Sequence, residues 1–242
     1  MKKLILWDLD GTLIDTIKDL GAAVNHTLDL RGLPSLRLDD YRHMVGHGVR
    51  NLVQKALEEA LKRSVAEGTT GLEDSYVDSA LADFMEYYTA NIDVYSRPYP
   101  GMPELLSELA SAGVRMAVVS NKFQEGTEKL VRRFFPAIDF VAILGDRPGR
   151  PLKPSPEIVE EVLRRADAGV GYTRARNEAD AVLVGDSPTD VRTAANSGID
   201  AIAVAWGYRS TEELAGTAPT APLRIAGDVY ELRRMLDFSN QP

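Results

Sequence analysis

Short apolar runs alternate with amphipathic stretches along most of this chain, and a polar residue or cluster follows several of the runs. The runs lie at residues 4–7, 114–119, 140–143, 181–184 and 201–205. Runs of this length and composition are typical of strands buried on both faces, in the middle of a parallel sheet. Amphipathic stretches between the later runs predict helices, and a last strand and helix are expected within 223–236. The pattern therefore predicts an α/β fold with an open, doubly wound parallel sheet.

Residues 16–95 depart from this alternation because they carry helical periodicity and no strand pattern. Apolar residues recur at helical spacing at Ile17, Leu20, Val24 and Leu28, and again at Leu52, Leu57 and Leu61. A third helix is expected over 73–91, with turns at 32–34 and 67–71. We interpret 16–95 as a separate all-helical cover domain, inserted into an α/β core formed by 1–15 and 96–242.

Three of the predicted strands end in polar residues: Asp8, Ser120 and Asp186. Ligands of open parallel sheets bind outside the carboxyl ends of the strands, so these side chains are expected to converge. After Asp8, Gly11 favours a turn that brings the Asp10 carboxylate and the Thr12 hydroxyl toward the same strand end. The sequence therefore predicts an acidic site at the carboxyl edge of the sheet.

Composition excludes several classes of function. The net charge is −8 and the chain has no clustered basic run, which argues against a nucleic-acid partner. The chain contains no cysteine, which excludes disulfides and thiolate chemistry and fits a reducing compartment. No apolar run approaches the roughly 20 residues that cross a bilayer. We expect a cytoplasmic protein without a membrane partner; a monomer and a homodimer are both compatible with the sequence.

Asp8, Asp186 and Asp190 supply the oxygen ligands that Mg²⁺ prefers, and a bound cation would relieve their mutual repulsion. Asp190 also stands three residues after Ser187, the spacing of a capping box, so it is open to interpretation as a helix cap alone. If the cation neutralises the charge of a bound phosphate ester, one carboxylate oxygen could attack phosphorus. A second carboxyl group could protonate the leaving oxygen and later activate water.

Hydroxyl and amine groups near the other strand ends complete the predicted phosphate site. Thr12 and Ser120 offer hydroxyls to phosphate oxygens, and Lys153 offers a compact cation for the developing charge. Lys122 is interpreted as peripheral, and Asp19 as an ordinary helix acid.

Four segments resemble the motifs of haloacid-dehalogenase-type phosphohydrolases, in order and over nearly the whole chain. They are Asp8-Leu-Asp-Gly-Thr-Leu-Ile-Asp15, Val118-Val-Ser-Asn-Lys122, Lys153-Pro and Gly185-Asp-Ser-Pro-Thr-Asp190. The helical insertion resembles the first type of cap in that superfamily. Further segments resemble phosphoglycolate-phosphatase-like members: Val45-Gly-His-Gly48, Pro98-Tyr-Pro-Gly101 and Trp206-Gly-Tyr208.

The resemblance implies a role for each matching residue. Asp8 would be the nucleophile and Asp10 the acid/base. Ser120 and Lys153 would hold the phosphate. Thr12 and Asn121 are further candidates for binding the substrate. Magnesium would be held by Asp8, the backbone carbonyl of Asp10 and Asp186, with Asp190 in support. His47 and Arg50, in the cap, are candidates for contacting a substrate carboxylate.

The function predicted from the sequence is magnesium-dependent hydrolysis of a small phosphorylated metabolite, and 2-phosphoglycolate is one candidate. Asp10 favours phosphate-ester chemistry, because dehalogenases and phosphonatases of the superfamily lack an aspartate there. A sugar phosphomutase and another phosphate or pyrophosphate hydrolase remain alternatives. Two alternatives of a different class are a phospho-accepting signalling domain and a non-catalytic binding protein. The polar segment 169–178 has no assigned role.

Overall fold

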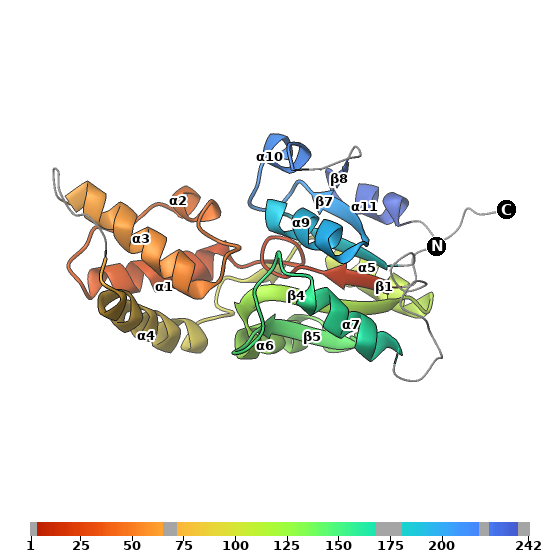
Figure 1. Ribbon diagram of the computed structural model, residues 1–242, viewed down its shortest axis with the longest axis horizontal. Coiled ribbons are helices and arrows are strands. Elements are labelled where there is room, and N and C mark those ends of the chain that lie inside the picture. Colours follow the sequence, from red (N-terminus) through yellow and green to blue (C-terminus); the bar gives the residue numbers. More distant parts are fainter. Residues whose placement is uncertain (1–3, 65–71, 168–180, 218–222, 237–242) are drawn as a thin grey trace. The chain divides into compact units, whose positions relative to one another are not determined.

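The computed structural model describes residues 4–64, 72–167, 181–217 and 223–236 (Figure 1). The predicted segments 67–71 and 169–178 lie outside the described residues. Backbone contacts divide the chain into an α/β unit, residues 1–15 and 98–242, and a helical unit, residues 16–97. The two domain boundaries expected from the sequence lie after residue 15 and after residue 95, so the second differs by two residues.

The α/β unit is built on a six-stranded sheet in which every pair of neighbouring strands is parallel. Across the sheet the strands are β5 (Ala142–Asp146), β4 (Arg115–Phe123), β1 (Leu4–Trp7), β6 (Ala181–Gly185), β7 (Asp200–Val204) and β8 (Arg224–Ala226). The predicted parallel α/β fold is confirmed. Because β1 lies between β4 and β6, the strands that precede Asp8 and Asp186 and the strand that carries Ser120 are direct neighbours.

Helices cover both faces of this sheet, as expected for strands that are apolar on both sides. They are α5 (Met102–Ser111), α6 (Gln124–Phe134), α7 (Glu157–Asp167), α9 (Pro188–Ser197), α10 (Thr211–Ala215) and α11 (Val229–Met235). Helices α7 and α9 pack on the face that carries Leu4 and Leu6. Ile5 and Trp7 point to the opposite face by strand alternation and are also fully buried.

Register fixes which strand ends meet. Trp7, the last residue of β1, lies opposite Val118 of β4 and Val184 of β6. The next residue, Asp8, donates its backbone N–H to the carbonyl of Val184 at 2.9 Å. Asp8 therefore enters the carboxyl edge of the sheet level with the segments that follow Val118 and Val184.

Several boundaries differ from the sequence prediction. β4 continues to Phe123 rather than ending at residue 119, and its register with β5 shifts between Val119 and Phe123. β5 begins at Ala142, two residues later than expected. The short helices at 38–42 and 211–215 were not predicted, because five residues are too few to show helical periodicity.

The helical unit contains α1 (Ile17–Asp29), α2 (Leu38–Arg42), α3 (Val49–Ser64) and α4 (Asp74–Ala90). Helix α1 contacts each of the other three, and α3 contacts α4. The predicted apolar stripe of α1 is buried, and Phe84 and Tyr88 stack inside the unit with ring centroids 5.2 Å apart. Burial of these side chains supplies the main driving force for this unit. The chain passes between the two units at β2 (Ile14–Asp15) and β3 (Arg97–Pro98), which pair in a two-stranded sheet.

Asp19 is not the ordinary surface acid that the sequence suggested, because its side chain is almost fully buried. Its carboxylate accepts hydrogen bonds from the backbone N–H groups of Tyr95 and Ser96 and, at 2.6 Å, from the Ser96 hydroxyl. The first turn of α1 is thereby tied to the segment that leaves the helical unit. No local pattern in the sequence marks this contact, since Tyr95 and Ser96 lie 76 and 77 residues from Asp19 along the chain.

Candidate active site

Three carboxylates converge at the carboxyl edge of the α/β unit. Asp8, Asp186 and Asp190 each place one oxygen so that the three atoms lie within 4.8 Å of one another. All three side chains are buried. Asp8 follows β1, Asp186 follows β6, and Asp190 lies in the first turn of α9. Like charges this close in a buried site repel strongly, so the ionised cluster requires cations for balance.

Lys153 supplies one such cation. Its Nζ atom lies 2.8 Å from Asp8 Oδ1 and 2.7 Å from Asp190 Oδ1, and it also donates to the carbonyl of Val119 at 2.9 Å. All three ammonium hydrogens therefore have an acceptor. The single lysine offsets one of the three carboxylate charges, so the fully ionised cluster keeps an excess of negative charge.

The backbone of Lys153 is fixed by Asn121. The Asn121 amide donates to the Lys153 carbonyl at 3.0 Å and accepts from the Lys153 N–H at 2.8 Å. This reciprocal pair locks the lysine against the end of β4. It accounts for both polar atoms of the Asn121 side chain, whose predicted contact with substrate stays a prediction.

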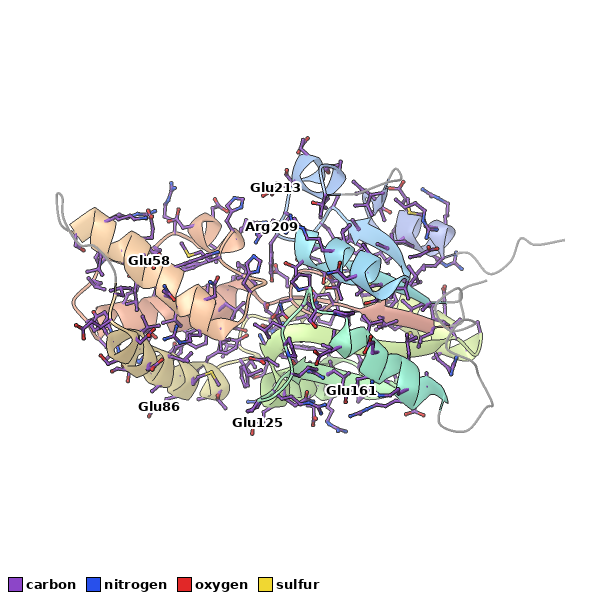
Figure 2. The ribbon with its side chains drawn as sticks, in the orientation of Figure 1. Glu58, Glu86, Glu125, Glu161, Arg209 and Glu213 are labelled. Carbon is purple, nitrogen blue, oxygen red and sulfur yellow. The ribbon has the colours of Figure 1, made fainter. Side chains whose placement is uncertain are left out.

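A pair of arginines braces the loop that leads to Lys153. Arg147 and Arg150 donate to the carboxylate of Glu161 in α7 at 2.6 and 2.9 Å, and Arg150 also donates to the carbonyl of Gly145. Glu161 is labelled in Figure 2. Because Glu161 is buried and part of a helix, it ties residues 147–150 to the α/β unit just before Lys153.

Asp186 is held by backbone that approaches it closely. The Tyr208 N–H donates to its Oδ2 at 2.7 Å, and the Thr12 hydroxyl lies 3.4 Å from its Oδ1. Gly11 and Gly207 press against the same carboxylate, and a Cβ atom at either position would collide with it. Gly11 also has φ of 89°, a left-handed conformation that favours glycine.

Asp190 combines the two roles that the sequence left open. Its Oδ2 accepts from the backbone N–H of Ser187 at 3.1 Å and from the Ser187 hydroxyl at 2.6 Å, which completes a capping box at the start of α9. Its Oδ1 accepts from Lys153. One oxygen thus caps the helix while the other belongs to the charged cluster.

Burial and mutual repulsion shift the ionisation of this cluster. Burial raises the pKa of Asp8 well above its usual value of 3.8; Lys153 offsets part of that effect, and Asp190 and Asp186 add to it. Burial, together with the charge of Asp190, raises the pKa of Asp186 to about 7. Burial lowers the pKa of Lys153, but the charges of Asp190 and Asp8 outweigh it, so the net pKa is above 10.5. The lysine is therefore charged at neutral pH.

The donor set fits a divalent cation. The carboxylate oxygens are hard ligands, they converge on one point, and they carry more negative charge than Lys153 offsets. Close packing by Gly11 and Gly207 leaves Asp186 few alternative positions. This buried acidic cluster could bind a metal ion.

The predicted hydroxyls lie in the same unit. Thr12 is fully buried, and its carbonyl accepts from the indole N–H of Trp206 at 3.2 Å. Ser120 follows Val119 in β4, and its Oγ accepts from the backbone N–H of Lys122 at 3.2 Å. Hydrogen bonds thus anchor both residues at the carboxyl edge of the sheet. Their contact with a phosphate stays a prediction.

Asp10 pairs with Lys122, which the sequence analysis treated as peripheral. The Lys122 Nζ atom lies 3.2 Å from each carboxylate oxygen of Asp10. The lysine side chain is only 1% exposed, so this position is not a surface one. No pattern in the sequence indicates the pair, because its members are 112 residues apart.

His47 and Arg50 belong to the helical unit. Arg50 Nη2 lies 2.8 Å from Asp74 and 3.1 Å from Asp78, so the two carboxylates of α4 account for its charge without a substrate. His47 lies in the turn before α3. Their predicted contact with a substrate carboxylate stays a prediction.

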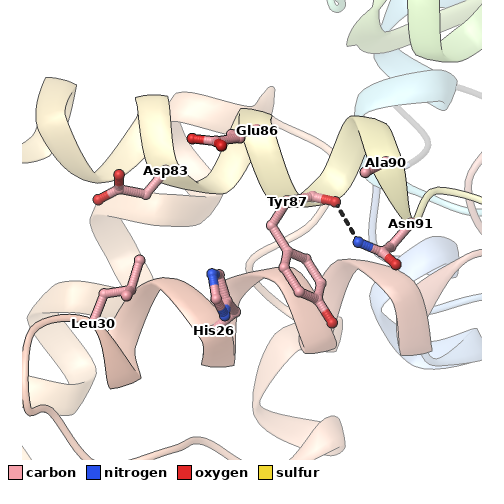
Figure 3. A pocket seen from close by; sticks show the side chains of 7 residues that line it. All are labelled: His26, Leu30, Asp83, Glu86, Tyr87, Ala90 and Asn91. Carbon is pink, nitrogen blue, oxygen red and sulfur yellow. Dashed lines mark hydrogen bonds between the residues drawn. The ribbon is translucent and has the colours of Figure 1, made fainter.

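A groove on the helical unit lies between α1 and α4 and has a volume of about 390 Å³ (Figure 3). His26 stacks on Tyr87 across it, with ring centroids 4.3 Å apart. The Asn91 side chain donates to the Tyr87 carbonyl at 2.9 Å. Stacking accounts for His26 as a packing residue.

The chain matches the family model described as haloacid dehalogenase-like hydrolase over residues 5–204. It therefore belongs to this family. The phosphoglycolate phosphatase of Mesorhizobium japonicum is 35% identical over 207 residues, which cover 86% of this chain and 84% of the relative. The phosphoglycolate phosphatase of Aquifex aeolicus is 32% identical, over 85% of this chain and 86% of the relative.

Solved structures agree with this membership. A candidate phosphoglycolate phosphatase from Lactobacillus delbrueckii subsp. bulgaricus has a TM-score of 0.81 and 31% identity, covering 97% of this chain and 98% of the other. CbbY from Rhodobacter sphaeroides, crystallised with phosphate, has a TM-score of 0.67 and 25% identity over 96% of this chain and 99% of its own. The chain is a phosphatase of the haloacid dehalogenase-like family, which sets aside the signalling-domain and non-catalytic alternatives. Among the helices in the described part of the chain, none has the length and apolar character needed to cross a membrane.

Proposed function

We propose that the protein hydrolyses a small phosphate monoester in two steps through a phosphorylated Asp8, and that the cation it uses is Mg²⁺. The observation that carries this proposal is the convergence of Asp8, Asp186 and Asp190 within 4.8 Å, with Lys153 between two of them. Asp8, Asp186 and the Asp10 carbonyl would hold the ion, with Asp190 in support. Bound magnesium neutralises phosphate charge and favours the ionised form of the carboxylates.

In the first step, a carboxylate oxygen of Asp8 attacks phosphorus, and the bond to the ester oxygen breaks. The leaving oxygen keeps the electron pair and takes a proton from Asp10. In the second step, Asp10 takes a proton from water, whose oxygen attacks the phosphoryl group on Asp8. The bond between phosphorus and the Asp8 oxygen breaks, Asp8 is regenerated and phosphate is released.

The remaining side chains bind and orient the phosphoryl group. Lys153 donates a hydrogen bond to Asp8 and offers a fixed positive charge to the phosphoryl oxygens. Thr12 and Ser120 add hydroxyl donors. We propose that His47 and Arg50 of the helical unit contribute to specificity. A cytoplasmic location fits the absence of cysteine.

We propose 2-phosphoglycolate as the substrate, on the strength of relatives that carry this activity in their names at 32–35% identity. The test is a steady-state screen of phosphate monoesters with magnesium, including 2-phosphoglycolate, sugar phosphates, nucleotides and pyrophosphate. The highest kcat/KM is expected for 2-phosphoglycolate. Another ester hydrolysed faster would contradict the substrate, and conversion of a sugar phosphate to its isomer without phosphate release would indicate a mutase.

Magnesium should raise the unfolding temperature more at about pH 8 than at about pH 5.5. Burial raises the pKa of Asp186 to about 7 in the metal-free fold, against 3.8 for an ordinary aspartate. With the folded pKa raised, the stability that this group contributes is present at low pH and is lost as pH rises toward 7. Magnesium must also displace the proton at low pH, so its stabilisation grows as pH rises.

The measurement is thermal unfolding with saturating magnesium or with chelator at the two pH values. In Asp186→Asn the dependence of the magnesium effect on pH should weaken, and the raised pKa of Asp8 accounts for what remains, whereas the exposed-site control Asp139→Asn should keep it in full. An equal magnesium shift at both pH values in the unmodified protein would contradict the role assigned to Asp186.

A further inference from the structure

Lys122, which pairs with Asp10 in the α/β unit, has no role in the proposed mechanism. Lys122 Nζ is equidistant from the two Asp10 oxygens, at 3.2 Å from each. The side chains are 1% and 12% exposed, so the lysine is the more enclosed partner. A lysine is costly to bury unless its charge is paired, and here the carboxylate of Asp10 pairs it.

The backbone of Lys122 is anchored on both sides. Its N–H donates to Ser120 Oγ at 3.2 Å, and its carbonyl accepts from Thr127 Oγ1 at 3.2 Å. It lies where the register between β4 and β5 shifts, between Val119 and Phe123. Register shifts of this kind redirect side chains at the ends of strands. The ammonium group is therefore presented from a fixed strand end and not from a flexible loop.

The two buried lysines of this edge hold different carboxylates. Lys153 contacts Asp8 and Asp190, whereas Lys122 contacts both oxygens of Asp10. Lys153 therefore serves the nucleophile and the acidic cluster. Asp10, the proposed acid/base residue, pairs with Lys122, whose backbone is held by Ser120 and Thr127.

We propose that Lys122 is a positioning residue for proton transfer: it fixes the Asp10 carboxyl so that an oxygen faces the ester oxygen of the substrate. The inference rests on the proposed acid/base role of Asp10. In the step concerned, the bond between phosphorus and the ester oxygen breaks, the electron pair stays on that oxygen, and the proton moves to it from Asp10. Lys122 itself exchanges no proton.

A positioning role for Lys122 predicts a change in selectivity between substrates, which a purely structural role would not produce. An alkoxide leaving group needs protonation as it departs, whereas para-nitrophenolate is stable enough to leave without it. A misplaced Asp10 should therefore slow the cleavage of alkyl esters selectively. The value of kcat/KM reports events up to the departure of the leaving group, so later hydrolysis of phospho-Asp8 does not obscure the comparison.

The test measures kcat/KM of Lys122→Met for glycerol phosphate and para-nitrophenyl phosphate. The expected loss is about 100-fold or more on the alkyl ester and less than about tenfold on the nitrophenyl ester. Asp10→Asn is the reference and should show the same selectivity. The double variant should be no worse than Asp10→Asn alone, because the two residues act as a unit. Lys129→Met, at an exposed position of α6, is the matched control and should behave as the unmodified protein does.

The outcomes separate this inference from the proposed function. If Asp10→Asn shows no selectivity between the esters, the acid/base role of Asp10 fails. If Asp10→Asn is selective and Lys122→Met loses both activities equally or neither, the positioning role of Lys122 is overturned. Should Lys122→Met not fold, Lys122→Gln keeps a hydrogen-bond donor to Asp10 without the charge and is judged by the same selectivity, with thermal unfolding as the check on its fold.

Discussion

Asp8→Asn is expected to abolish turnover, lowering kcat/KM for every phosphate ester by about 10⁴-fold or more. The amide cannot replace the carboxylate as the attacking group, so no phosphoryl group is transferred to residue 8. Mass spectrometry of acid-quenched reactions should find one phosphoryl group on the peptide that contains Asp8 in the unmodified protein. The same peptide of the variant should carry none.

The variant should lose activity without losing stability. Burial raises the pKa of Asp8 well above 3.8, which shows that the fold holds this charge at a cost. The substitution removes a like charge from the neighbourhood of Asp186 and Asp190, so unfolding in chelator should occur at the same temperature or higher. Asp139→Asn, at an exposed position, is the control and should keep full activity. Turnover by Asp8→Asn at the unmodified rate would rule out Asp8 as the nucleophile.

Lys153→Met is expected to damage both stability and activity. The lysine is 3% exposed and lies between Asp8 and Asp190, so its removal leaves two buried carboxylates without their shared cation. Removing one partner of a buried ion pair costs about 3–5 kcal/mol of folding free energy. Loss of the charge that we propose contacts the phosphoryl group should also lower kcat by about 10²–10³-fold, as observed for comparable electrostatic contacts.

The pH dependence distinguishes this explanation from lost packing. The pKa of Lys153 is raised above 10.5, so its stabilising contribution is complete below that pH and is constant across the neutral range. In the variant, Asp8 takes a proton more readily, since burial already raises its pKa. The stability deficit should therefore shrink as pH falls, and magnesium should also reduce it.

Chemical denaturation of both proteins at several pH values, with chelator and with magnesium, measures this deficit. The matched control is Lys129→Met, which removes a lysine from an exposed helix position and should leave the unfolding free energy within about 0.5 kcal/mol of the unmodified value. A deficit for Lys153→Met that is the same under all conditions would mean that packing, and not charge balance, explains the burial of this lysine.

The local pattern of the chain was enough to predict its fold class. The apolar runs had no polar alternation, which requires cover on both faces of a sheet, and the structure has helices on both faces. The order of polar strand ends also predicted that Asp8 and Asp186 would meet, because neighbouring parallel strands share a carboxyl edge. The structure brings them within 4.8 Å, while their catalytic roles remain proposals.

Other features of the site depended on tertiary structure. Lys122 was interpreted as peripheral, yet it pairs with Asp10 across 112 residues of chain. Asp19 was interpreted as an ordinary helix acid, yet it is buried against the backbone of Tyr95 and Ser96. Asn121 holds the backbone of Lys153. Each of these contacts joins segments that are far apart in the sequence, where no periodicity or spacing rule operates.

The sequence by itself determined which chemical groups the protein has and at which strand ends they stand, because strand burial and turn formation depend on nearby residues. Only the tertiary structure decided how the charges are divided, with Lys153 between Asp8 and Asp190 and Lys122 on Asp10. The physical reason is that a buried charge is stable only where a partner lies within a few ångströms, and that distance is set by packing of distant segments.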